Sequence, residues 1–338
     1  MSIPETKILE NSSQQPKPKI LNRRNLLLGG AGMLTLAGGG TAWAYNRYLA
    51  EHTQISDVAS YEAQSLTNTD TRAQAGSESE LTDLAITDTG LTADNGSITL
   101  STVVQKEGTS DQITAYIADI KLESATLLRS AFAKNQFGLN IIDYPSSIAA
   151  EHKGIWAING DYYGFRESGI EIRNGVIYRD SGAREGLAFY TDGRVKVYDE
   201  TTTSAQTLVD EGVWHTLSFG PSLIAGDAIA EGIEDYEVDT NLGNHSIQGN
   251  QPRSGIGYIE PNHFIFIAVD GRSQGYSRGV TMAEFAQMFI GRGCSIGYNI
   301  DGGGSTDMVF NNNLVNNPLG KGEERGTSDI LYIAGSLA

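Results

Sequence analysis

Two apolar runs, each ending in an aspartate and a glycine, constrain the fold of this chain most strongly. They lead into Asp270 and Asp301 and occupy residues 264–270 and 296–301. Between them, apolar residues recur at helical spacing over residues 281–290, with Thr281 as the predicted N-cap. A strand, a helix and a second strand form a crossover unit, and the two strands of such a unit are normally parallel. The sequence therefore predicts that both runs point the same way in one sheet.

The ends of these two strands supply the first candidate site residues. Parallel strands present their carboxyl ends at one edge of the sheet, where open α/β sheets bind ligands. We therefore expect Asp270 and Asp301 to share one rim. The second aspartate is followed by four small residues, Gly302, Gly303, Gly304 and Ser305. Glycines allow a ligand to approach the backbone, and consecutive N–H groups can bind an anion. The alternative is a tight glycine turn that Asp301 only caps.

Two further segments place polar residues at the same predicted rim. A short apolar strand at residues 155–158 ends in Asn159, a glycine and Asp161. Arg253 lies between a proline and a predicted strand, and Arg272 follows Asp270 by two residues. Arginine can hold a phosphate or a carboxylate in bidentate fashion, although many arginines serve only in structural ion pairs. These residues extend the candidate site to acids, an amide and two cations.

The order of these segments resembles the phosphodiester glycosidase family. The motifs that carry the resemblance are NGDYY from residue 159, FGPSLI from 219, QPRSGIG from 251, VDGRSQGYSRGVTMAEFA from 269, NIDGGGSTDMV from 299, and NNP with a later ER before the last strand. The resemblance extends from about Ile98 to the C-terminus and implies an α+β domain. One departure is Asp307, which stands where the family often has an apolar residue.

The resemblance also implies an activity, namely cleavage of the glycosidic bond of a sugar-1-phosphodiester such as an N-acetylglucosamine-1-phosphodiester. On this basis Asp301 is expected to act as nucleophile or as the base for water, with Asp270 or Asp161 as the second acid. Arg253 would hold the phosphate, helped by Arg272 and by the N–H groups of residues 302–305. Asn159 would bind sugar or phosphate and orient the acids.

Other uses of the same residues stay open. Asp161, Asp270 and Asp301 are also candidate ligands of Ca²⁺ or Mg²⁺, which prefer oxygen donors. The bond that is cut could belong to an exopolysaccharide without phosphate, by hydrolysis or transfer, with Arg253 gripping a carboxylate or a sulfate. A non-catalytic protein that binds wall polymers is the third interpretation. The net charge of −17 makes nucleic acid an improbable partner.

The N-terminal part of the chain predicts its location. Residues 1–24 form a basic tail that is expected in the cytoplasm, and residues 25–45 carry no charge and are long enough for a transmembrane anchor. The alternative is a cleaved signal segment and a secreted protein, for which the pair Arg23 and Arg24 resembles a twin-arginine signal. We expect a single-pass membrane protein whose C-terminal domain lies outside the cytoplasm and acts on a cell-surface glycan in the cell wall.

The remaining residues form one domain behind a spacer. Residues 46–97 are polar, and we expect a disordered linker with a short helix between Ala50 and Leu66. Residues 98–338 predict one α+β domain with a mixed β-sheet and a few helices. Residues 112–120 alternate as a strand, and residues 187–198 predict a hairpin around Asp192 and Gly193.

Overall fold

The computed structural model describes residues 45–66, 80–238 and 246–335. The chain divides into two compact units, Met1–Ala50 and Glu51–Ala338. The first unit is described only from Tyr45 to Ala50. Most of the predicted membrane segment at residues 25–45, and the whole basic tail at 1–24, lie outside the described residues. Where the chain is described, no helix combines the length and the apolar character needed to cross a bilayer.

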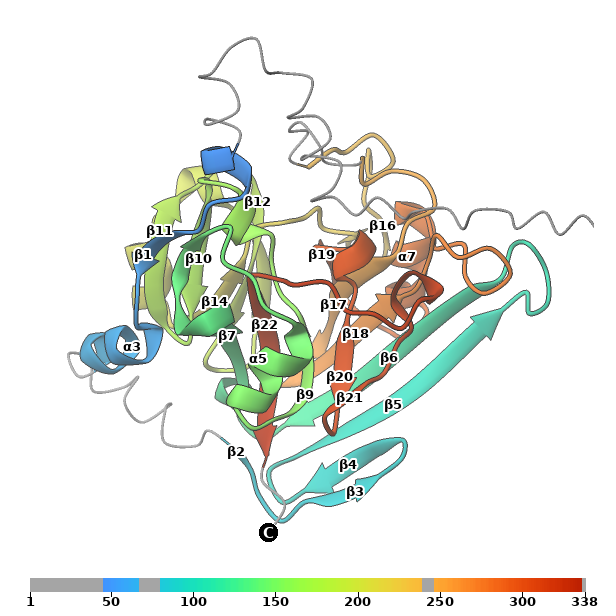
Figure 1. Cartoon of the computed structure of the whole chain (residues 1–338), viewed down its shortest axis with the longest axis horizontal. Helices are drawn as coiled ribbons and strands as arrows, with labels where there is room; N and C mark the ends of the chain where they lie inside the picture. Colours follow the sequence, from blue (N-terminus) through green and yellow to red (C-terminus); the bar gives the residue numbers. More distant parts are fainter. Residues whose placement is uncertain (1–44, 67–79, 239–245, 336–338) are drawn as a thin grey trace, which may run out of the picture. The chain divides into compact units, whose positions relative to one another are not determined.

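A seven-stranded sheet forms the larger layer of the second unit (Figure 1), and every neighbouring pair in it is antiparallel. In spatial order its strands are β19 (Ile296–Ile300), β17 (Arg253–Glu260), β18 (His263–Val269), β6 (Ile113–Leu122), β5 (Gly96–Gln105), β4 (Gly90–Ala93) and β3 (Ala85–Thr87). β17 runs antiparallel to both β18 and β19, so these two strands run in the same direction with β17 between them.

A six-stranded sheet forms the second layer. Its strands are β2 (Glu80–Leu81), β22 (Asp329–Gly335), β9 (Gly154–Asn159), β20 (Met308–Phe310) and β21 (Asn313–Leu314) in order, with β7 (Leu128–Phe132) also paired to β22. The pair β2–β22 is parallel, and the other pairs of this sheet are antiparallel.

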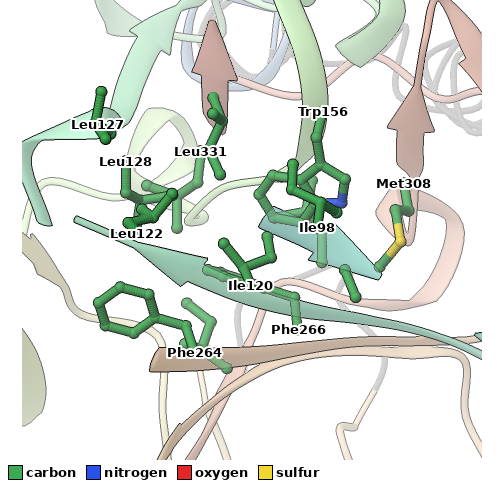
Figure 2. Close-up of a cluster of buried hydrophobic side chains, with 14 of the residues drawn as sticks. Ile98, Ile120, Leu122, Leu127, Leu128, Trp156, Phe264, Phe266, Met308 and Leu331 are labelled. Carbon is green, nitrogen blue, oxygen red and sulfur yellow. The ribbon is translucent and has the colours of Figure 1, made fainter. Parts of the chain in front are cut away.

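The two sheets pack face to face over the largest buried cluster. Ile98 and Phe266 from the first sheet meet Trp156, Met308 and Leu331 from the second (Figure 2). The rings of Trp156 and Phe266 lie with their centroids 4.7 Å apart. Each such large side chain contributes roughly 1.5–3 kcal/mol when it is fully buried, so this interface is a main source of stability.

The outer face of each sheet is covered by a helix. Along β18, Phe264 and Phe266 face the second sheet, whereas Ile265 and Ile267 pack with α7 (Met282–Ile290) in a separate cluster. On the other sheet, α5 (Pro145–Glu151) packs against β9, β20 and β22. The order of layers is therefore helix, sheet, sheet, helix. β18 is apolar after its first residue, from Phe264 to Val269, because both of its faces are buried.

Smaller elements complete the unit. The strands are β13 (Val195–Asp199), β12 (Glu185–Tyr190) and β14 (Val213–Leu217) in one sheet, and the pairs β10 (Gly169–Arg173) with β11 (Val176–Ser181), β1 (His52–Ile55) with β8 (Phe137–Leu139), and β15 (Ile224–Ala225) with β16 (Ala228–Ile229). The remaining helices are α3 (Val58–Leu66), α6 (Ala205–Asp210), and the short 3-10 turns Ala125–Leu127, Ala133–Asn135, Tyr163–Phe165, Glu200–Thr202, Gly303–Ser305 and Pro318–Gly320.

Several predictions made from the sequence are confirmed. Thr281 caps α7 in a full capping box, in which its side chain accepts from the backbone N–H of Glu284 and the Glu284 carboxylate accepts from the backbone N–H of Thr281. The hairpin around Asp192 and Gly193 is β12–β13. The α+β class also holds, and the six-stranded sheet is mixed as predicted, because its pair β2–β22 is parallel. The structure adds a second large sheet, which is antiparallel in every described pair.

The predicted disordered linker is wrong for the described parts of residues 46–97. Residues 52–66 form β1 and α3, which pack on the domain, and residues 80–97 form β2 to β4 and the start of β5. Val58 of α3 is buried against Phe132 and Phe137. A few apolar residues suffice here, because the existing sheets supply backbone partners and an apolar surface that a polar segment lacks by itself.

Candidate active site

The predicted strand ends do meet at one edge of the seven-stranded sheet. Asp270 directly follows β18 and Asp301 directly follows β19. Arg253 opens β17 opposite Val269, and Ser254 lies opposite Ile300. The two aspartates therefore share a rim, as predicted, although they lie on strands that β17 separates.

Asn159 joins this rim to the second sheet. It is the last residue of β9 and is fully buried. Its Nδ2 donates to the carbonyl of Asp301 at 2.7 Å and to the carbonyl of Gly160 at 3.3 Å. Its Oδ1 accepts from Ser254 Oγ at 2.7 Å and from the backbone N–H of Asp307 at 3.3 Å. Both amide atoms are used within the protein, so Asn159 positions Asp301 and has no donor left for a substrate.

Asp301 is the one predicted acid that reaches the surface. It is partly exposed, whereas Asp161 and Asp270 are buried. Burial raises the pKa of Asp301, and Arg325, the Ser305 hydroxyl and the Gly302 N–H oppose that rise. Ser305 Oγ in turn accepts hydrogen bonds from Nε of Arg325 at 3.2 Å and from its Nη2. Arg325, Ser305 and Asp301 thus form one hydrogen-bonded series.

The guanidinium group of a second arginine, Arg272, lies against the same glycine turn. A Cβ placed on Gly303 would lie 3.6 Å from Nη1 of Arg272, and one on Gly304 would lie 3.1 Å from Nη1 of Arg325. Arg272 and Arg325 are both exposed. Partial burial and the positive charge of Arg325 lower the pKa of Arg272. The two guanidinium groups repel one another, so an anion bound between them would be stabilised. The arrangement can therefore bind an anion next to the carboxylate of Asp301.

The glycine turn contributes a particular backbone conformation rather than free N–H donors. The Gly302 N–H donates to the carboxylate of Asp301, the Gly303 N–H to the carbonyl of Pro252 at 3.0 Å, and the Ser305 N–H to the carbonyl of Gly302 at 3.1 Å. These three N–H groups already have partners within the protein, whereas the sequence predicted that they bind an anion. Gly303 has a φ of +64°, and a Cβ on Gly302 would lie 2.8 Å from the Pro252 carbonyl, so glycine is required at both positions.

Asp270 is fully buried and bound by neutral donors. Its Oδ1 accepts from Asn316 Nδ2 at 2.8 Å, and its Oδ2 accepts from the Tyr276 hydroxyl at 2.7 Å and from the Asn317 N–H at 2.8 Å. Burial raises its pKa, and these donors only partly offset the rise. Asp270 therefore anchors the loops around Tyr276 and Asn316 behind the accessible site.

Asp161 belongs to a buried ion network. Its Oδ1 accepts from Nη2 of Arg166 at 2.7 Å, and its backbone N–H donates to Asp329 at 3.0 Å. Arg173 contacts both Glu171 and Asp329 at 3.0 Å. Burial by itself would raise the pKa of Asp161, but Arg166 and Arg173 hold it below its usual value. A carboxylate held in this way suits a structural role beneath the rim.

Arg253, the predicted phosphate ligand, is also buried. Its Nε donates to the carbonyl of Val280 at 2.8 Å, and its Nη2 donates to the carbonyls of Ile247 at 2.7 Å and Gly249 at 3.0 Å. Burial and the nearby charge of Arg272 lower its pKa to about 10. Arg253 therefore holds loops to the start of β17. The exposed arginine beside the glycine turn is instead Arg325, which was not among the predicted site residues. The ER motif contained Arg325, but its distance in the chain from Asp301 concealed that both side chains bond to Ser305.

Among the described residues, no group of three or more acidic, histidine or cysteine side chains converges as a metal site. Asp161, Asp270 and Asp301 each have separate protein partners, as described above. Binding of Ca²⁺ or Mg²⁺ at these residues stays a prediction.

A partly exposed aspartate and two arginines gather around one glycine turn at the shared edge of two packed sheets, and they define an α+β protein with an acid–cation site. The sequence model of the phosphodiester glycosidase family matches residues 152–334, and the chain belongs to this family. The match includes Asp301, Arg272 and Arg325.

Similarities to single proteins were also found. The SPbeta prophage-derived uncharacterized protein YomE of Bacillus subtilis (strain 168) is 29% identical over 193 residues, which are 56% of this chain and 28% of that protein. The chain thus spans little more than a quarter of that relative. The zebrafish N-acetylglucosamine-1-phosphodiester alpha-N-acetylglucosaminidase catalytic domain, auto-inhibited by its pro-peptide, has a TM-score of 0.54 at 20% identity, covering 75% of this chain and 86% of that one. This second likeness concerns the fold.

Proposed function

We propose that the protein hydrolyses the glycosidic bond of a sugar-1-phosphodiester in a cell-surface glycopolymer, from a membrane-anchored position outside the cytoplasm. The observation that carries the proposal is that Arg272 and Arg325 lie against Gly303 and Gly304 of the turn that follows Asp301, and that the charge of Arg325 acts on the Asp301 carboxyl. A sugar-1-phosphodiester needs a carboxylate at the anomeric carbon and positive charge at the phosphate, and these groups supply both.

The chemistry requires little acid assistance. The bond between the anomeric carbon and the bridging oxygen breaks, and its electron pair leaves with a phosphate monoester that Arg272 and Arg325 stabilise. Water adds to the anomeric carbon, either directly with Asp301 taking its proton, or after Asp301 has bonded to that carbon. A phosphate leaves without prior protonation, which agrees with the burial of Asp161 and Asp270. The first-formed anomer, followed by ¹H NMR, distinguishes inversion from retention.

The decisive assay uses the whole chain and the methyl diester of N-acetylglucosamine-1-phosphate, followed by ³¹P NMR. We expect methyl phosphate to form, and we expect Asp301→Asn to slow its formation by about 10²–10⁴-fold. Asp192→Asn is the matched control, since Asp192 is an exposed acid in the β12–β13 turn. Full activity in a folded Asp301→Asn protein would exclude Asp301 as the reacting carboxylate.

Parallel arms test the finer parts of the proposal. A chelator added to the same reaction reports whether a divalent cation takes part. A protein that cleaves uncharged or carboxylated exopolysaccharides but not the phosphodiester would move the function to the alternative glycosidase. Binding of wall polymers without any cleavage would identify a non-catalytic receptor.

A further inference from the structure

A groove lies at the open side of the two-sheet interface, apart from the acid–arginine site. It is bounded by the β3–β4 turn at residues 87–89, by β5 at residues 100–102, by Tyr116 of β6, and by the β20–β21 hairpin from Phe310 to Val315. We call it the side groove. Its volume is about 450 Å³, within the range of small-molecule sites.

The lining of the side groove is polar and nearly uncharged. Hydroxyl and amide side chains predominate, and they are Thr87, Thr89, Ser101, Thr102, Tyr116, Asn311 and Asn313. Asp88 is the one charged residue of the lining, and it is an acid. A groove of this composition offers no cation to a phosphate or a carboxylate, and its hydroxyl and amide groups can both donate to and accept from a ligand that carries several hydroxyl groups.

Hydrogen bonds connect the side groove to the sheet edge that carries Asp270 and Asp301. The Tyr116 and Tyr276 hydroxyls lie 2.9 Å apart, and the Tyr276 hydroxyl donates to Oδ2 of Asp270 at 2.7 Å. Because Tyr276 has one proton and gives it to Asp270, Tyr116 must donate to Tyr276. The lone pairs of the Tyr116 oxygen that remain can accept from a ligand in the groove.

The hairpin side makes a second connection. Val315 lines the groove, and its neighbour Asn316 donates to Oδ1 of Asp270 at 2.8 Å. Asp270 is followed after one residue by Arg272, which stands on the glycine turn. The loops that hold the arginine therefore rest on the same residues that close the groove.

We infer that the side groove binds an uncharged, hydroxyl-rich glycan segment of the substrate, while the phosphate lies at Arg272 and Arg325. This inference rests on the proposed function. β6 is separated from β19 by β18 and β17, and at about 4.8 Å per strand Tyr116 lies roughly 14 Å from the end of β19. An oligosaccharide can extend over that length and a methyl ester cannot, so a polymeric substrate occupies both the groove and the arginine site, whereas a small diester occupies only the arginine site.

The first test compares two substrates of the whole chain. One is the methyl diester of N-acetylglucosamine-1-phosphate, and in the other the methyl group is replaced by maltotriose. We expect a lower KM for the maltotriose diester. Thr102→Trp fills the groove and should reduce this preference by about tenfold, the equivalent of one or two lost hydrogen bonds. Thr99→Trp is the matched control, because Thr99 is an exposed residue of the same strand outside the groove, and it should keep the preference.

The second test does not depend on turnover. Saturation-transfer NMR measures binding of free maltotriose, mannotriose and triacetylchitotriose to the whole chain and to Thr102→Trp, Thr99→Trp and Tyr116→Phe. We expect at least one trisaccharide to bind, with loss of the signal in Thr102→Trp and weaker binding in Tyr116→Phe. If none binds, or if Thr102→Trp binds as well as Thr99→Trp, the inference is overturned.

The two tests separate the groove from the reaction. Trisaccharide binding that Thr102→Trp abolishes, together with no cleavage of either diester, would uphold the groove and overturn the proposed function. Cleavage of both diesters with equal KM in all variants would uphold the function and overturn the groove.

Discussion

The side-chain amide of Asn159 donates a 2.7 Å hydrogen bond to the backbone carbonyl of Asp301. This contact links the end of β9 in one sheet to the end of β19 in the other. Four hydrogen bonds of one buried side chain thereby set the position of the accessible acid. The relationship explains why the candidate site forms where the two sheets meet.

Replacing Asn159 by alanine should therefore affect stability and activity together. Buried partners left without a hydrogen bond cost about 1–3 kcal/mol, and we expect the free energy of unfolding to fall by about 2–4 kcal/mol. Urea denaturation measures this change. Gln206→Ala, at an exposed amide of α6 bonded to Asp210, should change it by less than about 0.5 kcal/mol. An Asn159→Ala protein as stable as the control would show that the contact does not hold the sheets together.

Arg325 and Arg272 should act on substrate binding. Each charge-assisted hydrogen bond to phosphate is worth about 1.5–3 kcal/mol, so Arg325→Gln and Arg272→Gln should each raise KM about tenfold or more and weaken inhibition by inorganic phosphate. Arg325→Lys should recover part of the loss, since the charge remains and the planar fork does not. Arg194→Gln removes an exposed arginine of the β12–β13 hairpin and serves as control. Unchanged phosphate inhibition in both site variants would rule out this anion site.

Arg173 should be required for folding. It is fully buried and contacts Glu171 and Asp329, so its removal leaves buried carboxylates without their cation. We expect Arg173→Met to lower the free energy of unfolding by about 3–5 kcal/mol, measured in urea. Arg194→Met should have almost no effect, because that ion pair is exposed. Equal stability of the two variants would mean that the buried network adds nothing to the fold.

Asp307 should make stability depend on pH in a defined direction. Burial raises its pKa to about 8, and the nearby charge of Glu324 adds to the rise. A carboxyl whose pKa is higher in the folded state than its unfolded value of about 4 stabilises the protein fully below pH 4. That contribution is lost as the pH increases from about 4 to 8.

The variant Asp307→Asn removes this titration. Its stability relative to the wild-type protein should increase by about 1–3 kcal/mol between pH 5 and pH 9, in urea unfolding at several pH values. Asp210→Asn, at an exposed acid of α6, should leave the difference independent of pH. A difference that shrinks as the pH rises would contradict the raised pKa of Asp307.

Local patterns predicted much of the fold. Thr281 followed by Glu284 predicted the start of α7, and the apolar periods predicted β18, β19 and β6, because capping and burial act over a few neighbouring residues. The shared rim of Asp270 and Asp301 also followed, since a helical crossover returns the chain in the same direction. The insertion of β17 between their strands did not follow, because the pairing of β17 with β19, which comes much later in the chain, is a long-range choice.

The predicted linker shows where local patterns fail. Residues 52–66 and 80–97 are polar enough to predict disorder, yet they form strands and a helix on surfaces that distant residues create. Val58 is buried only because Phe132 and Phe137 are already packed beneath it. The composition of a segment indicates how much apolar surface that segment can bury by itself. It does not indicate which apolar surface another segment provides.

The sequence by itself determined the α+β class and the family, because those features depend on short motifs and their order, and it predicted Asp301 as the leading acid. Only the tertiary structure decided which charged residues are accessible. Asp161, Asp270 and Arg253 are of the same residue types as the more exposed Asp301, Arg272 and Arg325. Folding buries them against Arg166, Asn316 and Val280. Arg325 is brought to Ser305 from twenty residues away. Desolvation and the choice of partner are properties of the packed chain, and they separate the groups that hold the site from those that face a substrate.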